Sequence, residues 1–239
     1  NLDSVYFFLS SIKEFSPKSK FFFASSNRVF GDSQISPQNE ETPVRPNSLY
    51  GIFKAAASAI IRMYREKEGI FACSGILYNH ESPRRDPEFL PRKIAITVAQ
   101  IKSGATDSLR VGDLTARRDW GYAKDYVEGM WLMLQQENPD DYVLATGENH
   151  TVKEFVEEAC RLVDIDIIWE GEGLNEKGIN RKDNKVIVAV DSMYLRPAEV
   201  SILIGDYSKA RNKLGWEPKV KFNELVKIMI EHDLRLVSD

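Results

Sequence analysis

Hydrophobic residues follow two kinds of spacing along this chain, and each spacing predicts a type of element. Apolar positions three to four residues apart predict helices. Short apolar runs predict strands, and nearly continuous runs suit parallel strands that are covered on both faces. The expected strands are Lys20–Ser25, Phe71–Tyr78, Ser108–Val111 and Tyr142–Ala145. The expected helices are Asn1–Phe15, Leu49–Lys67, Pro91–Ser103, Ala123–Gln136, Val152–Val163, Ser208–Leu214 and Phe222–Leu236.

Alternation of strands and helices favours a layered α/β fold. Thr151 followed by Glu154 has the form of a capping box and predicts the start of one helix. The pattern changes from Ile165 onward. Residues Trp169–Val190 are rich in Gly, Asn, Lys and Glu and predict an irregular loop with a single strand, Lys185–Val190. We therefore expect a smaller lobe beside the main sheet.

Composition limits the classes of partner. The 239 residues are 43% hydrophobic and 28% charged, which suits one globular domain with a small additional lobe. A net charge of −4 gives no basic field for nucleic acid, and no apolar run is long enough to span a membrane. Cys73 and Cys160 lie in separate apolar contexts, and no Cys/His cluster has metal-ligand spacing. We expect two reduced core thiols, no metal and a cytoplasmic location.

The most informative chemistry lies in Tyr50 and Lys54, which share one face of the expected helix because they are four residues apart. A nearby ammonium group lowers the pKa of a phenol, so Tyr50 can move a proton to or from a sugar hydroxyl. Ser26 follows an apolar strand and can hydrogen-bond the same hydroxyl. These three residues are the candidate catalytic group of an enzyme that uses a nicotinamide cofactor.

Such an enzyme needs a place for the cofactor pyrophosphate, normally a glycine-rich turn between a strand and a helix. None of the 14 glycines forms a Gly-x-x-Gly-x-x-Gly turn, and the chain opens on a helix that leads into the first expected strand. The chain is therefore expected to correspond to the C-terminal part of a nucleotide-binding enzyme, shortened either in the protein or in its gene.

Several longer motifs resemble the GDP-mannose 4,6-dehydratase family of the extended short-chain dehydrogenase/reductases. The run Asn-His-Glu-Ser-Pro-Arg-Arg at 79–85 is the most specific of them. The segments at 117–128, 145–148 and 194–200 resemble the same family. The similarity extends from about Phe21 to the C-terminus.

The resemblance implies a Rossmann-like, doubly wound parallel sheet and an oligomeric enzyme. It places a partial dinucleotide-binding domain in residues 1–164 and a mainly substrate-binding lobe in 165–239, interleaved around 80–120. The implied reaction needs NADP and GDP-mannose: hydride leaves sugar C4, water is lost across C5 and C6, and hydride returns to C6.

The resemblance also implies roles for individual residues. Tyr50 is the proton acceptor at the C4 hydroxyl and Lys54 binds the nicotinamide ribose. Positions that contact the cofactor match His80 and Arg85. Positions around the GDP-sugar match Asn79, Leu90, Lys93, Arg118, Arg196 and Glu199.

Asp119 and Asp125 are expected to pair with neighbouring arginines or to cap a helix.

The chain departs from the family pattern at Arg28, where the family has the glutamate that removes the C5 proton. A guanidinium stays protonated and cannot act as that base. Loss of a general base costs about 10²–10⁴ in rate, so the elimination step is in question. Three functions stay open: a GDP-mannose 4,6-dehydratase, a related enzyme that oxidises, reduces or epimerises only at C4, and a shortened GDP-sugar-binding remnant without activity.

Overall fold

The computed structural model describes residues 2–195 and 203–238, and the chain divides into two compact units. The first unit comprises Asn1–His80, Asp119–Asn149 and Val200–Lys219, and the second comprises Glu81–Arg118, His150–Glu199 and Val220–Asp239. The chain passes between the units more often than a single division near residue 164 implies. The expected assignment of cofactor and substrate roles to 1–164 and 165–239 stays a prediction.

A three-stranded parallel sheet forms the centre of the first unit. Its strands are β1 (Phe21–Ala24), β2 (Ala72–Leu77) and β7 (Tyr142–Leu144), in the order β1-β2-β7. Only sequence-distant strands pair here, because parallel neighbours need a crossover between them. The doubly wound α/β class expected from the sequence is confirmed.

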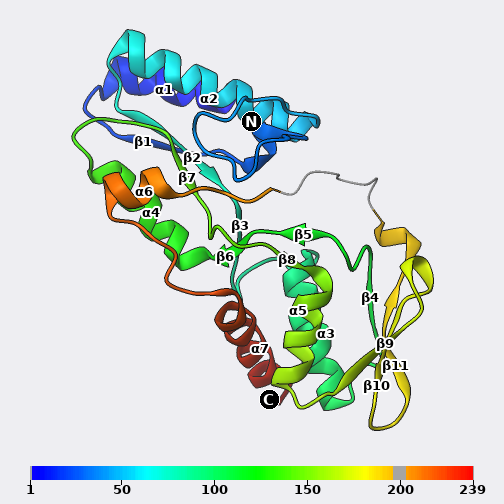
Figure 1. The fold of residues 1–239 in the computed structure, drawn as a ribbon. Coiled ribbons are helices and arrows are strands. Elements are labelled where there is room, and N and C mark those ends of the chain that lie inside the picture. The colour runs from blue at the N-terminus through cyan, green and yellow to red at the C-terminus, as the bar shows by residue number, and fades with distance from the viewer. Residues whose placement is uncertain (1, 196–202, 239) are drawn as a thin grey trace. The chain divides into compact units, whose positions relative to one another are not determined.

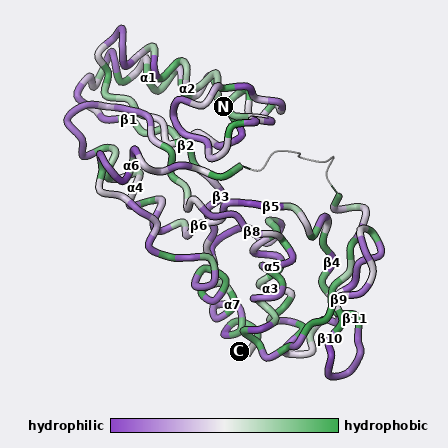
Figure 2. Tube along the Cα trace, in the orientation of Figure 1, coloured by the Kyte–Doolittle hydropathy of each residue, from purple (hydrophilic) through white to green (hydrophobic). Residues whose placement is uncertain are grey.

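Helices cover both faces of this sheet (Figure 1). One face carries α1 (Leu2–Phe15) and α2 (Leu49–Glu68), and the other carries α4 (Ala123–Gln135) and α6 (Ser208–Leu214). Successive side chains of a strand point to opposite faces, and β2 follows this rule. Ala72 packs among residues of α1 and α2, whereas Cys73 packs with residues of α4 and α6. Figure 2 shows hydrophobic and hydrophilic residues alternating along α1 and α2, as expected for helices with one buried face.

Short elements connect the layers of the first unit. A 3₁₀ turn, η1 (Asn27–Phe30), follows β1, and the short strands β3 (Asn79–Glu81) and β6 (Trp120–Tyr122) pair with each other.

The second unit combines three helices with a mixed sheet. Its helices are α3 (Leu90–Ser103), α5 (Val152–Leu162) and α7 (Phe222–Ser238), and α3 contacts both others. The sheet has the order β4-β11-β10-β9, in which only the β4–β11 pair is parallel. These strands are β4 (Leu109–Val111), β9 (Ile167–Glu170), β10 (Lys177–Asn180) and β11 (Lys185–Val190). Strands β5 (Arg117–Arg118) and β8 (His150–Thr151) form a separate pair, and η2 (Gly173–Asn175) and η3 (Ser192–Tyr194) are 3₁₀ turns.

Every strand and helix predicted from the spacing of apolar residues is present, with ends that differ by at most two residues. The Thr151–Glu154 capping box is confirmed by both of its hydrogen bonds. The strand predicted at Lys185–Val190 is present as β11. The prediction that it is the only strand within Trp169–Val190 is wrong, because β10 and the end of β9 lie there as well. Both strands have only four residues, and β10 (Lys-Gly-Ile-Asn) contains Gly and Asn, which are weak strand formers.

Candidate active site

Tyr50 and Lys54 lie in the first turns of α2, where Ser48 caps the helix by accepting a hydrogen bond from the Gly51 amide at 3.2 Å. The Lys54 ammonium nitrogen is 5.5 Å from the centre of the Tyr50 ring. It donates a hydrogen bond of 2.6 Å to the carbonyl oxygen of Ala24, the last residue of β1. Partial burial lowers the pKa of Lys54. The Tyr50 side chain is 54% exposed and open to a ligand.

Ser26 lies directly beyond β1 and is buried. Its hydroxyl caps η1 by accepting a hydrogen bond of 3.3 Å from the Arg28 amide. The neighbouring Ser25 hydroxyl lies 3.0 Å from that of Ser58 on α2, which links the end of the strand to the helix. Ser26 is thus held by the same strand end that Lys54 contacts.

Arg28 belongs to η1, which packs closely against the start of α2. A Cβ atom on Gly51 would overlap the carbonyl oxygen of Arg28, so only glycine allows this approach. Together, η1 and α2 bring Ser26, Arg28, Tyr50 and Lys54 to the carboxyl end of β1. In open α/β sheets ligands bind at this end of the strands.

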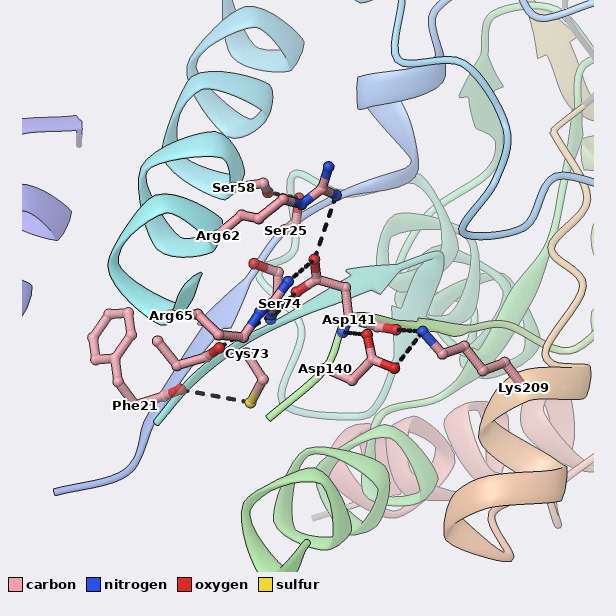
Figure 3. Close-up of polar contacts among 11 residues, drawn as sticks. Phe21, Ser25, Ser58, Arg62, Arg65, Cys73, Ser74, Asp140, Asp141 and Lys209 are labelled. Carbon is pink, nitrogen blue, oxygen red and sulfur yellow. Dashed lines mark hydrogen bonds and ion pairs between the residues drawn. The ribbon is translucent and has the colours of Figure 1, made fainter. Parts of the chain in front are cut away.

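The opposite end of the sheet holds α2 in place through Asp141 (Figure 3). The Asp141 carboxylate accepts two hydrogen bonds of 2.9 Å from Arg65 of α2 and one of 2.8 Å from the Ser74 amide of β2. Burial alone would raise the pKa of Asp141, but these bonds and the charge of Arg65 lower it. This ion pair fixes α2 on the sheet and thereby positions Tyr50 and Lys54.

Glu40 is a carboxylate that follows Arg28 in the loop before α2. Its Oε1 accepts a hydrogen bond of 2.7 Å from the Val143 amide in β7. Partial burial raises the pKa of Glu40. The carboxylate therefore covers the edge of a strand, and the structure gives it no contact with Ser26, Tyr50 or Lys54.

His80 is oriented by two contacts within the first unit. Its Nδ1 lies 2.8 Å from the Tyr78 carbonyl oxygen, and its ring stacks on Tyr126 with 5.0 Å between the centres. A carbonyl oxygen only accepts hydrogen bonds, so Nδ1 carries the proton. Asn79, a predicted substrate residue, precedes His80 in β3 and is partly buried.

Arg85, the other predicted cofactor residue, lies in the second unit between a carboxylate and a ring. Its Nε is 3.4 Å from Oε2 of Glu81, and its guanidinium lies 3.7 Å from the centre of the Phe89 ring. Glu81 is almost fully buried, and this burial raises the pKa of its carboxyl to about 7 despite the charge of Arg85.

The predicted substrate residues are described only in part. Leu90 begins α3, and Lys93 lies one turn later, over the ring of Tyr194. Arg118 lies in β5, and its Nη1 donates a hydrogen bond of 2.7 Å to the Arg117 carbonyl oxygen. Arg196 and Glu199 lie outside the described residues.

Asp119 holds together distant backbone segments, a role that the sequence around it did not indicate. It is buried and accepts hydrogen bonds from the amides of Thr146, Gly147 and Gly205 and from the Thr146 hydroxyl. The expected pairing with an arginine is therefore wrong for Asp119. Burial raises its pKa to about 6 even though these bonds favour the carboxylate. It joins three segments that are far apart in sequence, which a local pattern cannot reveal.

Some kinds of site are absent from the part of the chain that the structure describes. No group of three His, Cys, Asp or Glu side chains there can hold a metal ion. No described helix is both long and apolar enough to cross a membrane.

Solved structures share this fold. A structure titled RMD from Pseudomonas aeruginosa complexed with NADPH matches 97% of this chain and 72% of its own, with a TM-score of 0.82 and 18% identity. A dTDP-glucose 4,6-dehydratase from Bacillus anthracis in complex with NAD matches 95% of this chain and 65% of its own, with a TM-score of 0.76 and 23% identity. The chain thus has the Rossmann-like fold of these structures.

The sequence comparisons then give the family. The model of the family described as GDP-mannose 4,6 dehydratase matches residues 1–229. The chain is 48% identical over 222 residues to the GDP-mannose 4,6 dehydratase of Dictyostelium discoideum and 49% identical over 218 residues to that of Homo sapiens. These alignments cover 93% and 91% of the chain but only 62% and 59% of the relatives. The chain belongs to the GDP-mannose 4,6-dehydratase family and spans about 60% of the length of these relatives.

Proposed function

We propose that the protein acts on a GDP-sugar, with GDP-mannose as the expected substrate, and that its chemistry begins with oxidation at sugar C4. The observation that carries this proposal is the cluster of Ser26, Tyr50 and Lys54 at the carboxyl end of β1 in a member of this family. The family reaction continues with loss of water across C5 and C6.

The proton of the C4 hydroxyl goes to Tyr50 in this proposal. The Lys54 ammonium, 5.5 Å from the centre of the Tyr50 ring, places a positive charge beside the residue that takes this proton. Ser26 donates or accepts a hydrogen bond at the sugar hydroxyl and keeps it oriented. Since Lys54 also binds the Ala24 carbonyl, its charge stays at the end of the strand.

A nicotinamide cofactor fits the donors at this site, since Lys54 offers an ammonium group and Tyr50 an exposed hydroxyl for ribose oxygens. When bound, the nicotinamide supplies the hydride acceptor for C4. His80 and Arg85 are the further residues proposed to hold it, and NADP is the proposed form. Two structural neighbours are complexes with NADPH and with NAD, which supports this class of cofactor.

The glycine-rich turn expected for a pyrophosphate does not occur in the 239 residues. We therefore expect the chain by itself to bind NADPH weakly.

GDP-sugar recognition is proposed for Asn79, Leu90, Lys93, Arg118, Arg196 and Glu199. Guanidinium groups suit a diphosphate because they donate paired hydrogen bonds. Arg196→Ala should weaken GDP binding by about 1.5–3 kcal/mol, the usual worth of a hydrogen bond to a charged group. Calorimetric titration with GDP, GDP-mannose and ADP tests the assignment, which fails if the guanine ligands bind no better than ADP.

A second candidate function is favoured by Arg28. In this alternative the enzyme oxidises or epimerises C4 without dehydration, because a guanidinium stands where the family has its base. The local geometry supports this candidate, since η1 packs Arg28 against the start of the helix that carries Tyr50.

We further propose a homo-oligomer in the cytoplasm. Several large apolar side chains are exposed on the packed helices α1 and α2, which supports coverage by a second copy. They include Phe7, Phe15, Leu49 and Phe53. Cys73 and Cys160 are buried and unpaired, and burial raises the pKa of each thiol to about 12, which suits a reducing compartment. Sedimentation of the protein at several concentrations tests the oligomer, and a monomer at all of them would contradict it.

A further inference from the structure

Ser58 has no part in the proposed chemistry, yet it lies on the same face of α2 as Tyr50 and Lys54. The three residues follow one another at intervals of four, which places them on successive turns of one helix face. The Ser58 hydroxyl lies 3.0 Å from the hydroxyl of Ser25, directly beyond β1 (Figure 3). It therefore forms the next polar contact between α2 and this strand after that of Lys54 with Ala24.

Ser25 is fixed on the sheet independently of α2. Its amide donates a hydrogen bond of 2.9 Å to the carbonyl oxygen of Gly75 in β2. The residue is only 4% exposed, and a hydroxyl buried to this extent costs free energy unless it is hydrogen-bonded. The bond between Ser25 and Ser58 therefore favours one placement of α2 against the end of the strand.

This placement matters because Ser25 stands between two residues that serve the candidate site. Ala24 accepts the hydrogen bond from the Lys54 ammonium, and Ser26 carries the hydroxyl proposed to bind the sugar. A movement of α2 relative to Ser25 would change the distance between Lys54 and Ser26.

Packing opposes such a movement in one direction only. A Cβ atom on Gly51 would lie 2.5 Å from the Arg28 carbonyl oxygen, so the start of α2 cannot come closer to η1. Movement away from η1 meets no such obstacle. The ion pair of Arg65 with Asp141 holds the C-terminal part of α2, and the bond of Ser58 lies between that pair and the catalytic end.

We propose that Ser58 is a positioning residue for the oxidation at C4. Its hydrogen bond to Ser25 keeps the first turns of α2 against the end of β1. Tyr50 and Lys54 thereby stay at a fixed distance from Ser26. This inference rests on the proposed function, since the reaction that Ser58 supports is the one proposed for Tyr50.

The first test measures the loss of deuterium from C4 of GDP-mannose with NADP, in a full-length protein of this family that contains these 239 residues. Ser58→Ala should lower the rate at saturating substrate by roughly 2- to 13-fold, the value of one hydrogen bond between uncharged groups, and leave KM unchanged. Ser58→Thr keeps the hydroxyl and should react like the wild type. Ser10→Ala is the matched control and should not change the rate, because Ser10 and Tyr64 form a hydroxyl pair of 2.7 Å near the C-terminal end of α2.

A double-mutant cycle isolates the bond between the two serines. The variant with both Ser25→Ala and Ser58→Ala should be no slower than the slower single variant, because either change already removes the bond. Losses that multiply in the double variant would show that the two hydroxyls act separately and would overturn the inference.

A measurement on the 239-residue protein needs no reaction. Partial burial lowers the pKa of Lys54, and NMR titration of its side chain follows that pKa, with the signal assigned by its absence from Lys54→Met. In Ser58→Ala the pKa of Lys54 should rise towards its ordinary 10.5, because the ammonium moves away from the strand end into solvent. In Ser10→Ala it should stay as in the wild type.

The outcomes separate this inference from the proposed function. An unchanged rate together with an unchanged Lys54 pKa in Ser58→Ala would overturn the positioning role and leave the proposed reaction intact. Equal effects of Ser58→Ala and Ser10→Ala would assign the loss to the stability of α2 and reject positioning. Absence of deuterium loss in the wild type would overturn the proposed reaction and this inference with it.

Discussion

At the scale of single residues, Arg28 is the position that separates the two proposed reactions. In the proposed mechanism, oxidation at C4 needs only Ser26, Tyr50, Lys54 and the cofactor, whereas loss of water also needs a base near C5. Tyr50 and Lys54 adopt the arrangement expected from their spacing, and η1 sets Arg28 beside them. A protein with an arginine at this position should therefore oxidise C4 and release little 6-deoxy product.

Arg28→Glu should raise the rate of dehydration by on the order of 10²-fold or more, because it restores a carboxylate where a base is required. The experiment uses a full-length protein of this family that contains the Ser26-Asn27-Arg28 segment. Mass spectrometry of the product from GDP-mannose measures the loss of water. Arg28→Gln is the matched control, since it removes the guanidinium without supplying a base. Rapid water loss by the unmodified enzyme would mean that another group acts as the base.

Asp119 gives a residue-scale prediction about pH. Its pKa is about 6 in the folded protein and near the ordinary 3.8 when unfolded, so between these values the folded state holds a proton that the unfolded state has lost. The contribution of Asp119 to stability is then complete below pH 3.8 and declines as the pH rises through 6. The total change is about 3 kcal/mol at roughly 1.4 kcal/mol for each pKa unit.

Denaturant unfolding of the wild type and Asp119→Asn at several pH values measures this change. The wild type should lose stability relative to the variant from pH 4 to pH 7. Parallel stability curves for the two proteins would show that Asp119 keeps an ordinary pKa.

At the scale of elements, the site depends on how α2 is held on the sheet. The Arg65–Asp141 ion pair is largely buried and also binds the Ser74 amide. Breaking a buried pair from one side leaves an uncompensated charge and costs about 3–5 kcal/mol. The neighbouring Asp140 carboxylate is 47% exposed and pairs with Lys209, and such exposed pairs contribute only about 0–1 kcal/mol.

Asp141→Asn should therefore lower the free energy of unfolding several times more than Asp140→Asn. Urea unfolding of the two variants at pH 7 makes the comparison. Because the pKa of Asp141 is lowered in the folded state, its contribution should persist above pH 3.8 and disappear as the pH falls below that value. Equal losses for the two variants would contradict the account of how α2 is positioned.

At the scale of the whole molecule, the sequence predicted the elements well and the division into units less well. Apolar runs such as Phe71–Tyr78 depend on local sequence, and the strands they predicted are present. The two units exchange segments at positions such as His80 and Asp119, and no local pattern marks those points. The short strands β9 and β10 pair with each other, and β10 also pairs with β11, so their formation depends on residues outside each strand.

In the candidate site, too, local sequence patterns predicted contacts within one element and did not predict contacts between distant segments. The spacing of Tyr50 and Lys54 predicted their contact because one helix carries both residues. The bonds of Lys54 to Ala24 and of Asp119 to Gly205 join residues far apart in the chain, so no sequence pattern indicated them.

Transfer of deuterium from sugar C4 tests the central claim, that Tyr50 serves a site that oxidises a GDP-sugar at C4. A full-length protein of this family that contains the Ser26-Asn27-Arg28 segment is incubated with NADP and with GDP-mannose deuterated at C4. Mass spectrometry follows the deuterium. We expect deuterium to leave C4 in the wild type, with a rate about 10²–10⁴ lower in Tyr50→Phe, the span for loss of a general acid–base group, and unchanged in Tyr6→Phe. Deuterium that remains at C4 throughout, or that leaves Tyr50→Phe at the wild-type rate, would contradict the account.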